Sequence, residues 1–217
     1  MVTLFFVKSL FPSANLMKNF VNFTSEFLTD ITFMTPVTLT QKQFESIIGI
    51  CRNIFMTKLK DYGTAWRVLR TSSITDQIYI KAQRIRSIDD KGMQKIDEGI
   101  KPEFIGIVNY SVIALIQIEL GNTEKLVLDP VEAGELYDKY AGCSLSLMLN
   151  KNHDYGEAWR NMRLSSLTDI ILMKLMRIKQ IEDNKGKTFI SEGVDANYYD
   201  IINYAVFALI KMEYENS

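Results

Sequence analysis

Residues 61–70 read DYGTAWRVLR, and residues 154–163, which begin 93 positions later, read DYGEAWRNMR. A segment that only fills a core can drift to other apolar residues of similar volume. Both copies instead keep an acid, a phenol, a glycine, an indole and two arginines. The repetition indicates a duplicated unit, and the residue types raise a chemical question as well as a structural one.

The similarity extends outward from this motif. Residues 60–86 align with residues 153–179 without a gap and share 15 of 27 positions. After one extra residue in the next loop, the match resumes at Glu98 and Glu192 and continues toward the end of the chain. A fixed offset of this kind is typical of a tandem duplication.

We therefore expect a first repeat over residues 35–122, a second repeat over residues 123–217, and together one globular unit. The leader, residues 1–34, lies outside the repeats. Its apolar start is interrupted by Lys8 and Pro12 and lacks the basic region of a secretory signal. We expect this leader to be poorly ordered.

Each repeat predicts three helices. The first should end at Gly63 and Gly156, where a left-handed glycine stops a helix. The second should start at Ser73 and Ser166, because an acid three residues later gives the spacing of a capping box. The third is apolar on nearly every side and must be buried. The expected first and third helices span residues 41–60 and 102–119 in one copy and 131–152 and 196–214 in the other.

One apolar third helix cannot be covered by two short partners, but two copies can bury their third helices against each other. The predicted fold is therefore all-α: a six-helix bundle of two three-helix repeats related by a pseudo-twofold axis. The chain would be a monomer that acts as a pseudo-dimer, or would form a homodimer.

Composition excludes several classes of function. The formal charge is −1, with 25 basic and 26 acidic residues, so no strong direct binding to nucleic acid is expected. This charge balance does not exclude binding of small anionic ligands. Cys51 and Cys143 do not form a CxxC pair, which fits a cytoplasmic location better than a zinc site or a disulfide. No run of ~18 apolar residues is evident, so no membrane partner is expected.

The third helices carry polar residues in apolar surroundings. Asn109 and Asn203 either tie helices together or face a polar pocket, because a buried amide needs partners. Asp200 precedes Asn203 by one turn, and Glu192 lies just before the same helix. Oxygen ligands grouped in this way suit Mg²⁺.

The first copy is not equivalent. Gly106 stands where the second copy has Asp200, with Glu103 one turn earlier and Glu98 at the helix entrance. Glycine offers no side-chain ligand. Either Glu103 substitutes for the missing carboxylate, or only one competent site remains.

Basic pairs one turn apart, Lys81 with Arg84 and Lys174 with Arg177, suit phosphate oxygens. The competing interpretation is a solvated or salt-bridged helix flank. Asp61 and Asp154 lie near a helix C-terminus, where a carboxylate opposes the helix dipole, which suggests a function beyond tightening the turn. The tryptophans of the motif could stack on a base or belong to the core. The sequence leaves both a structural and a functional role open for the tyrosine of each motif copy, which is Tyr155 in the second, and for its first arginine.

The motifs described so far occur in the same order in both repeats. Together they resemble the nucleotide modification associated domain of the first type. The match departs at Gly106. The resemblance implies a link to modified nucleotides and DNA-base modification, and its acid-rich helices are similar to those of MazG-type all-α nucleoside triphosphate pyrophosphohydrolases. The motifs are DYG at 61–63 and 154–156, Lys-x-x-Arg-Ile at 81–85 and 174–178, Glu98 and Glu192, GIVNY at 106–110 and DIINY at 200–204.

MazG-type enzymes hold Mg²⁺ against a triphosphate and activate water, but their EExxE signature is absent here. The leading hypothesis is a nucleotide-binding protein that acts as a Mg²⁺-dependent phosphohydrolase, with Glu192 and Asp200 as catalytic residues. The alternative is a non-catalytic helical binding or scaffold module. The metal ligands would be Glu192, Asp200, Glu98 and Glu103, and the substrate-binding residues Lys174, Arg177, Asn203, Asp154, Tyr155, Lys81, Arg84, Asn109 and Asp61.

Overall fold

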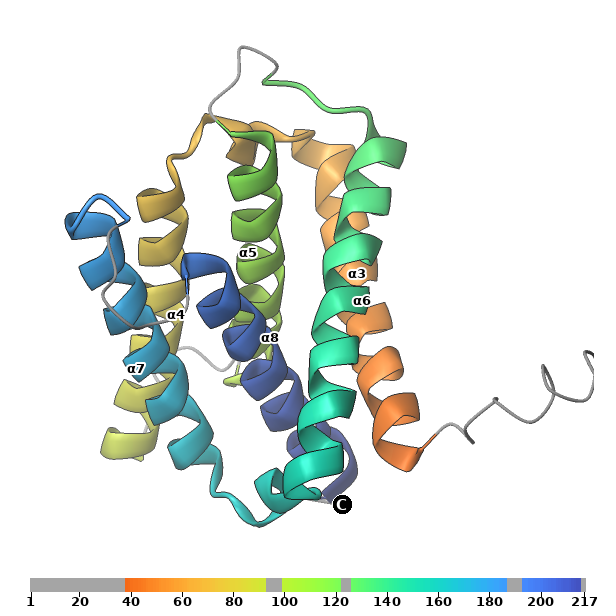
Figure 1. Cartoon of the computed structure of the whole chain (residues 1–217), viewed down its shortest axis with the longest axis vertical. Helices are drawn as coiled ribbons and strands as arrows, with labels where there is room; N and C mark the ends of the chain where they lie inside the picture. The colour runs from red at the N-terminus through yellow and green to blue at the C-terminus, as the bar shows by residue number, and fades with distance from the viewer. Residues whose placement is uncertain (1–37, 93–98, 122–125, 187–192, 216–217) are drawn as a thin grey trace, which may run out of the picture. The chain divides into compact units, whose positions relative to one another are not determined.

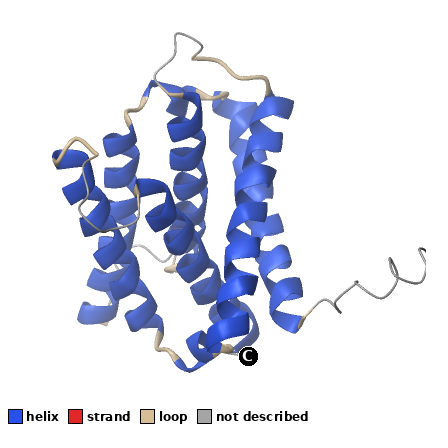
Figure 2. Ribbon diagram, viewed as in Figure 1, coloured by secondary structure: helices blue, strands red, loops and turns tan. Residues whose placement is uncertain are grey.

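The computed structural model describes residues 38–92, 99–121, 126–186 and 193–215. The predicted leader lies outside the described residues. The helices belong to one unit, Leu39–Ser217, and the described residues contain no strand (Figure 2). The all-α, six-helix prediction is confirmed. The helices are α3 (Leu39–Tyr62), α4 (Thr71–Lys91), α5 (Lys101–Leu120), α6 (Pro130–Tyr155), α7 (Leu164–Asp183) and α8 (Val194–Ile210) (Figure 1).

Short elements mark the same points in each repeat. The 3₁₀ helices η1 (Ala65–Val68) and η2 (Ala158–Asn161) follow the glycine turns, and a π-helical turn, η3 (Lys211–Glu215), extends α8. Gly63 has φ +58° and Gly156 has φ +61°, so the predicted left-handed stops are confirmed. A side chain at either position would be strained there.

The predicted capping boxes are wrong. Helices α4 and α7 begin two residues before Ser73 and Ser166, and their N-caps are Arg70 and Arg163, which make no side-chain capping bond. Both arginines are extended, with ψ near 150°, because the chain leaves the 3₁₀ turn in that conformation. The helix therefore starts at the next residue, and each serine falls inside its first turn.

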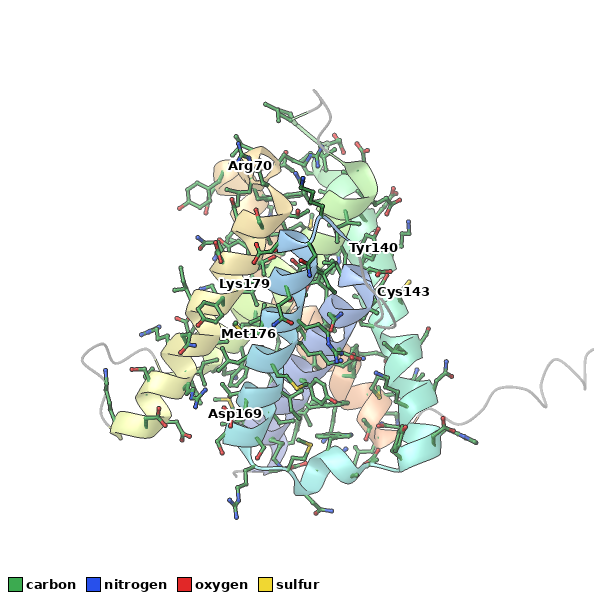
Figure 3. The ribbon with its side chains drawn as sticks, turned by 60° about the vertical axis from the view of Figure 1, so that its left-hand side comes forward. Arg70, Tyr140, Cys143, Asp169, Met176 and Lys179 are labelled. Carbon is green, nitrogen blue, oxygen red and sulfur yellow. The ribbon has the colours of Figure 1, made fainter. Side chains whose placement is uncertain are left out.

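The acids of the expected capping boxes form ion pairs between α4 and α7 instead. The Asp76 carboxylate accepts a bond of 2.5 Å from Lys179, and Asp169 lies 3.8 Å from Arg86. Asp169 and Lys179 lie along the face of α7 seen in Figure 3. At the repeat offset of 93, Asp169 aligns with Asp76 and Lys179 aligns with Arg86. Each ion pair therefore joins the acid of one repeat to the aligned basic position of the other.

Helices α5 and α8 form the centre of the bundle, where they contact each other (Figure 1). Helix α4 packs on α5, α7 packs on α8, and α4 contacts α7, while α3 and α6 contact each other and both central helices. Phe104, Ile107, Tyr198 and Ile201 are fully buried. Burying such a side chain contributes ~1.5 to 3 kcal/mol, so each repeat stabilises the other.

Helix α5 is long and apolar enough to cross a membrane by length and composition, contrary to the expectation that no such segment exists. However, 72% of its apolar window is buried inside the bundle. That burial is what the core helix of a bundle shows, and the predicted burial of both third helices is confirmed.

Candidate functional site

A pocket of about 560 Å³ lies in the second repeat, where α6 ends and the glycine turn leads into η2. Its size falls within the ~300 to 1,000 Å³ of small-molecule sites. Side chains from α6, η2, α7 and α8 converge on it. The polar and aromatic part of its lining includes Lys151, Tyr155, Trp159, Lys174, Asp200 and Asn203.

A second pocket of about 320 Å³ occupies the equivalent place in the first repeat. Each residue that lines it aligns with a residue lining the larger pocket. Residues of the DYGxAW motif therefore line a pocket in each half. The aligned pairs that carry the argument are Lys58 with Lys151, Tyr62 with Tyr155, Trp66 with Trp159, and Asn109 with Asn203.

Asp200 joins two lysines in the second-repeat pocket. Lys151 Nζ lies 2.5 Å from one carboxylate oxygen and Lys174 Nζ lies 2.5 Å from the other. The side chains of Asp200 and Lys174 are 7% and 11% exposed, whereas that of Lys151 is 47% exposed and reaches the mouth. Two ammonium groups against one carboxylate leave a positive excess, which suits an anionic ligand.

The first repeat uses its charges differently. A Cβ at Gly106 would lie 2.7 Å from Lys81 Cε, so the Lys81 side chain fills the space that a carboxylate takes in the second repeat. Lys81 Nζ lies 3.1 Å from the Glu103 carboxylate, and Arg84 donates a hydrogen bond to the same carboxylate. Glu103 thus pairs with two cations, and Lys58 is the only charged side chain among the described residues lining this pocket.

Asn109 is a structural tie. Its amide nitrogen donates to the Cys51 carbonyl at 3.0 Å, and the Tyr137 hydroxyl donates to its amide oxygen at 2.9 Å. The side chain therefore connects α5 with α3 of its own repeat and with α6 of the other. For this residue, the first of the two predicted roles is the one observed.

Asn203 lacks both bonds. It is 4% exposed, and neither its amide nitrogen nor its oxygen has a hydrogen-bond partner among the described residues. Phe44 aligns with Tyr137, because each lies 19 residues before the glycine of its own repeat. Phe44 has no hydroxyl, so it cannot give Asn203 the bond that Tyr137 gives Asn109. A buried amide without partners costs about 1 to 3 kcal/mol, and a ligand that bonded to Asn203 in this pocket would remove that cost.

Trp159 cannot offer a face to a base. The Phe207 ring stacks on it with centroids 4.2 Å apart, and the Arg160 guanidinium carbon lies 4.4 Å from the ring centroid. Its Nε1 is buried and lacks a partner in the described part of the chain. Tyr155 is 77% exposed, so the aromatic face available at the pocket mouth belongs to the tyrosine of the motif.

Tyr204 also lines the second-repeat pocket. Its burial, together with the nearby Asp200 carboxylate, raises the pKa of its hydroxyl. The phenol therefore stays protonated at neutral pH and can serve as a hydrogen-bond donor.

The first arginine of each motif is structural, which settles a question that the sequence left open. Arg67 is 3% exposed and donates to the Gln117 side chain at 2.5 Å and to the Gly121 carbonyl at 3.2 Å. Arg160 donates to Glu157 and, at 2.7 Å, to Glu215. Both guanidinium groups fix the 3₁₀ turn to the end of a third helix.

Several predicted residues lie outside the pockets. Asp61 and Asp154 are exposed, and Asp154 lies 3.2 Å from His153. Arg177 is exposed and absent from the lining. Lys174 therefore lines the pocket without Arg177, so the two members of the predicted Lys-x-x-Arg pair do not face the same pocket.

The described residues do not fit a resident divalent cation. Among them, no three His, Cys, Asp or Glu side chains form a group that could hold a metal ion. Glu103 and Asp200 are paired with cations, whereas Mg²⁺ needs about six oxygen ligands. Glu98 and Glu192, the other predicted ligands, lie outside the described residues.

Sequence reasoning missed Lys151. The signal was present, because Lys58 and Lys151 each lie five residues before their glycine. They fall just outside the gap-free block that drew attention to the motif.

Comparison with known protein families gives one match. The model of the family described as nucleotide modification associated domain 1 matches residues 58–118 and 151–212, together more than half of the chain. The two segments agree with a tandem duplication and contain most of the lining of the two pockets. Comparisons with curated proteins and with solved structures gave no match.

Proposed function

The chain belongs to the nucleotide modification associated domain 1 family, and from that premise we propose that its second-repeat pocket binds a phosphorylated nucleoside. The family description associates the chain with nucleotide modification. The lysines and the exposed tyrosine of the pocket support a small-molecule ligand that carries an anion and a planar ring.

The observation that supports the proposal most directly is the positive excess around Asp200. Lys151 and Lys174 share one carboxylate, so a phosphate can replace part of that pairing without leaving a buried charge alone. Lys151 is the more exposed of the two lysines and can turn toward a ligand at the mouth. The exposed ring of Tyr155 lies on the same lining and offers a stacking surface.

The proposal gives each chain one competent site. In the first repeat, Lys81 and Arg84 are bound to Glu103, and Asn109 is bound to α3 and α6. The smaller pocket therefore lacks the lysine–carboxylate ion pair, and the amide of Asn109 that lines it is already bonded within the protein.

The proposal also includes a pseudo-twofold relation between the halves, so that a monomer acts as a pseudo-dimer. The exchanged ion pairs Asp76–Lys179 and Asp169–Arg86 support it. So do the helix contacts, because α3 meets α8 as α6 meets α5. The aligned linings of the two pockets are a third support.

Any Mg²⁺ would arrive with the phosphates of the nucleotide, since Glu103 and Asp200, the two predicted ligands among the described residues, are already paired with lysine or arginine. Hydrolysis would also need a base to activate water. Asp200, the carboxylate in the pocket, accepts bonds from two ammonium groups. The proposal is therefore binding, and release of pyrophosphate is measured as a separate outcome.

Calorimetric titration with nucleoside mono-, di- and triphosphates, with and without Mg²⁺, tests the proposal. Lys151→Met should weaken binding at least tenfold, because a charge-assisted bond is worth about 1.5 to 3 kcal/mol. Lys58→Met removes the aligned lysine of the other pocket and should leave the affinity unchanged. Absence of binding across the panel, or equal losses in the two variants, would contradict the proposal.

A scaffold module is the second candidate. It is favoured by the pairing of Lys81, Arg84 and Asp200 within the protein, which is what a purely structural bundle requires. A chain that binds no nucleotide yet loses stability when these ion pairs are removed would support it.

A further inference from the structure

We infer that Asn203 recognises the hydrogen-bonding edge of a nucleobase held inside the second-repeat pocket. This inference rests on the proposed function for the phosphate end of the ligand. It adds the ligand class at the inner end: a planar ring that presents a donor and an acceptor side by side.

The first support is the state of the amide. Asn203 lines the pocket and is 4% exposed, and both its donor and its acceptor lack partners among the described residues. Asn109, at the aligned position, has both groups bonded. An amide with its donor and acceptor both unused is complementary to a base edge, which asparagine binds through two parallel bonds.

The second support is the cause of this difference. Tyr137 donates its hydroxyl to Asn109, whereas the aligned residue in the other repeat is Phe44, which is 1% exposed and carries no hydroxyl. The backbone partner differs as well. Asn109 donates to the Cys51 carbonyl, but Asn203 makes no bond to aligned Ser144, whose hydroxyl is also buried and without a partner in the described residues.

The third support is the neighbouring indole. Trp159 lines the same pocket, and its Nε1–H is buried and unbonded within the described part of the chain. Together with Asn203 it offers two donors and one acceptor. A nucleobase satisfies this set through one ring or exocyclic N–H and two acceptors, whereas a ribose phosphate alone has no planar edge to match it.

These positions orient the ligand. Asn203 and Trp159 are 4% and 5% exposed, while Lys151 and Tyr155 are open to solvent at the mouth. The base therefore lies inward and the phosphate outward. Asn203 then forms hydrogen bonds to the base, whereas Lys151 binds the phosphate of a nucleotide with any base.

The full chain is titrated with nucleoside monophosphates, nucleosides and ribose 5-phosphate. Asn203→Leu keeps the number and branching of the side-chain heavy atoms and removes both hydrogen-bonding groups. It should lower the affinity for nucleotides and nucleosides roughly tenfold or more and leave that for ribose 5-phosphate unchanged. Asn109→Gln serves as the matched change in the first repeat and should not alter nucleotide affinity.

A second variant keeps the test decisive if Asn203→Leu folds poorly. Phe44→Tyr places on α3 the hydroxyl that Tyr137 supplies from α6, so Asn203 gains an internal partner. We expect an unchanged or higher melting temperature together with a weaker affinity for nucleosides. Unchanged nucleoside affinity in both variants would overturn the inference.

The outcomes separate the two proposals. If Asn203→Leu weakens ribose 5-phosphate and nucleotides equally, the base-reading role is wrong and the phosphate pocket stands. If nucleosides bind through Asn203 and phosphate adds nothing, the base-reading role stands and the phosphate proposal fails. If wild-type protein binds none of these ligands, both are overturned.

Discussion

The two repeats differ most where their sequences look most alike. Each has a lysine on its second helix and an asparagine on its third, at aligned positions. Lys81 reaches past Gly106 to Glu103, and Asn109 is bonded on both sides. In the second repeat the lysine stops at a carboxylate inside the pocket, and the asparagine has no partner in the described residues.

This contrast teaches that a repeated motif can build the same cavity twice while its neighbours decide whether the cavity is available. The motif makes both turns and both pockets. Substitutions around it tie the lysine of the second helix and the asparagine of the third into the scaffold in the first repeat, whereas in the second repeat both line the cavity. The decisive exchanges are Gly106 for Asp200, Glu103 for Asn197, and Phe44 for Tyr137.

The largest expected effect sharpens the comparison of the two asparagines. Asn109→Leu should lower the free energy of unfolding by about 2 to 4 kcal/mol, because the Cys51 carbonyl and the Tyr137 hydroxyl lose a buried partner. Asn203→Leu should cost nothing or stabilise the protein slightly. Urea unfolding followed by circular dichroism measures both, and equal costs would erase the distinction.

A smaller effect compares the carboxylates. Asp200→Asn should destabilise by about 2 kcal/mol, because it leaves Lys174, whose side chain is only 11% exposed, without its counter-charge. Glu103→Gln should cost about 1 kcal/mol or less, since Lys81 and Arg84 are 26% and 29% exposed and better screened. A greater loss for Glu103→Gln than for Asp200→Asn in chemical unfolding would reverse this ranking.

Gly106→Asp would make the first repeat resemble the second, and its effect on stability should stay within about 0.5 kcal/mol. The new Cβ meets only the flexible end of Lys81, and aspartate is slightly better than glycine inside a helix. Gly106→Ala is the matched control, since it introduces the contact without a carboxylate for Lys81. Because alanine favours the helix over aspartate by up to about 0.7 kcal/mol, an alanine variant that is more stable than the aspartate variant by clearly more than this in thermal unfolding would show that Lys81 does not change partner.

Another small effect concerns pH and involves Glu182, which aligns with Asp89 of the first repeat. Burial raises the pKa of Glu182, whereas Asp89 is exposed. Because the pKa is higher in the folded state than in the unfolded state, this group supports folding fully below its unfolded pKa. That contribution is lost as pH rises through the folded pKa.

Glu182→Gln should therefore gain stability relative to wild type as pH rises above the ordinary pKa of a glutamate, by less than ~1 kcal/mol since the side chain is half-buried. Unfolding curves of both proteins at several pH values measure this difference, and a difference that does not grow with pH would contradict the assigned cause.

The candidate site was only partly predictable. Asp200, Lys174 and Asn203 were identified from residue type and spacing, and the structure brings them into one pocket. Arg177 was grouped with Lys174 by helical spacing but is exposed. The aligned Arg84 is held by Glu103, and the second repeat has Asn197 in place of that carboxylate. Lys151 was missed, since its role arises where α6 meets the other two helices.

The sequence by itself determined the duplication, the six helices, the glycine stops and the burial of both third helices. These properties follow from local backbone preference and from the distribution of apolar residues along the chain. Tertiary structure alone decided which lysine meets which carboxylate and which asparagine has no hydrogen-bond partner among the described residues. The physical reason is that these partners come from other helices and, for Asn109 and Tyr137, from the other repeat, so no local pattern records them.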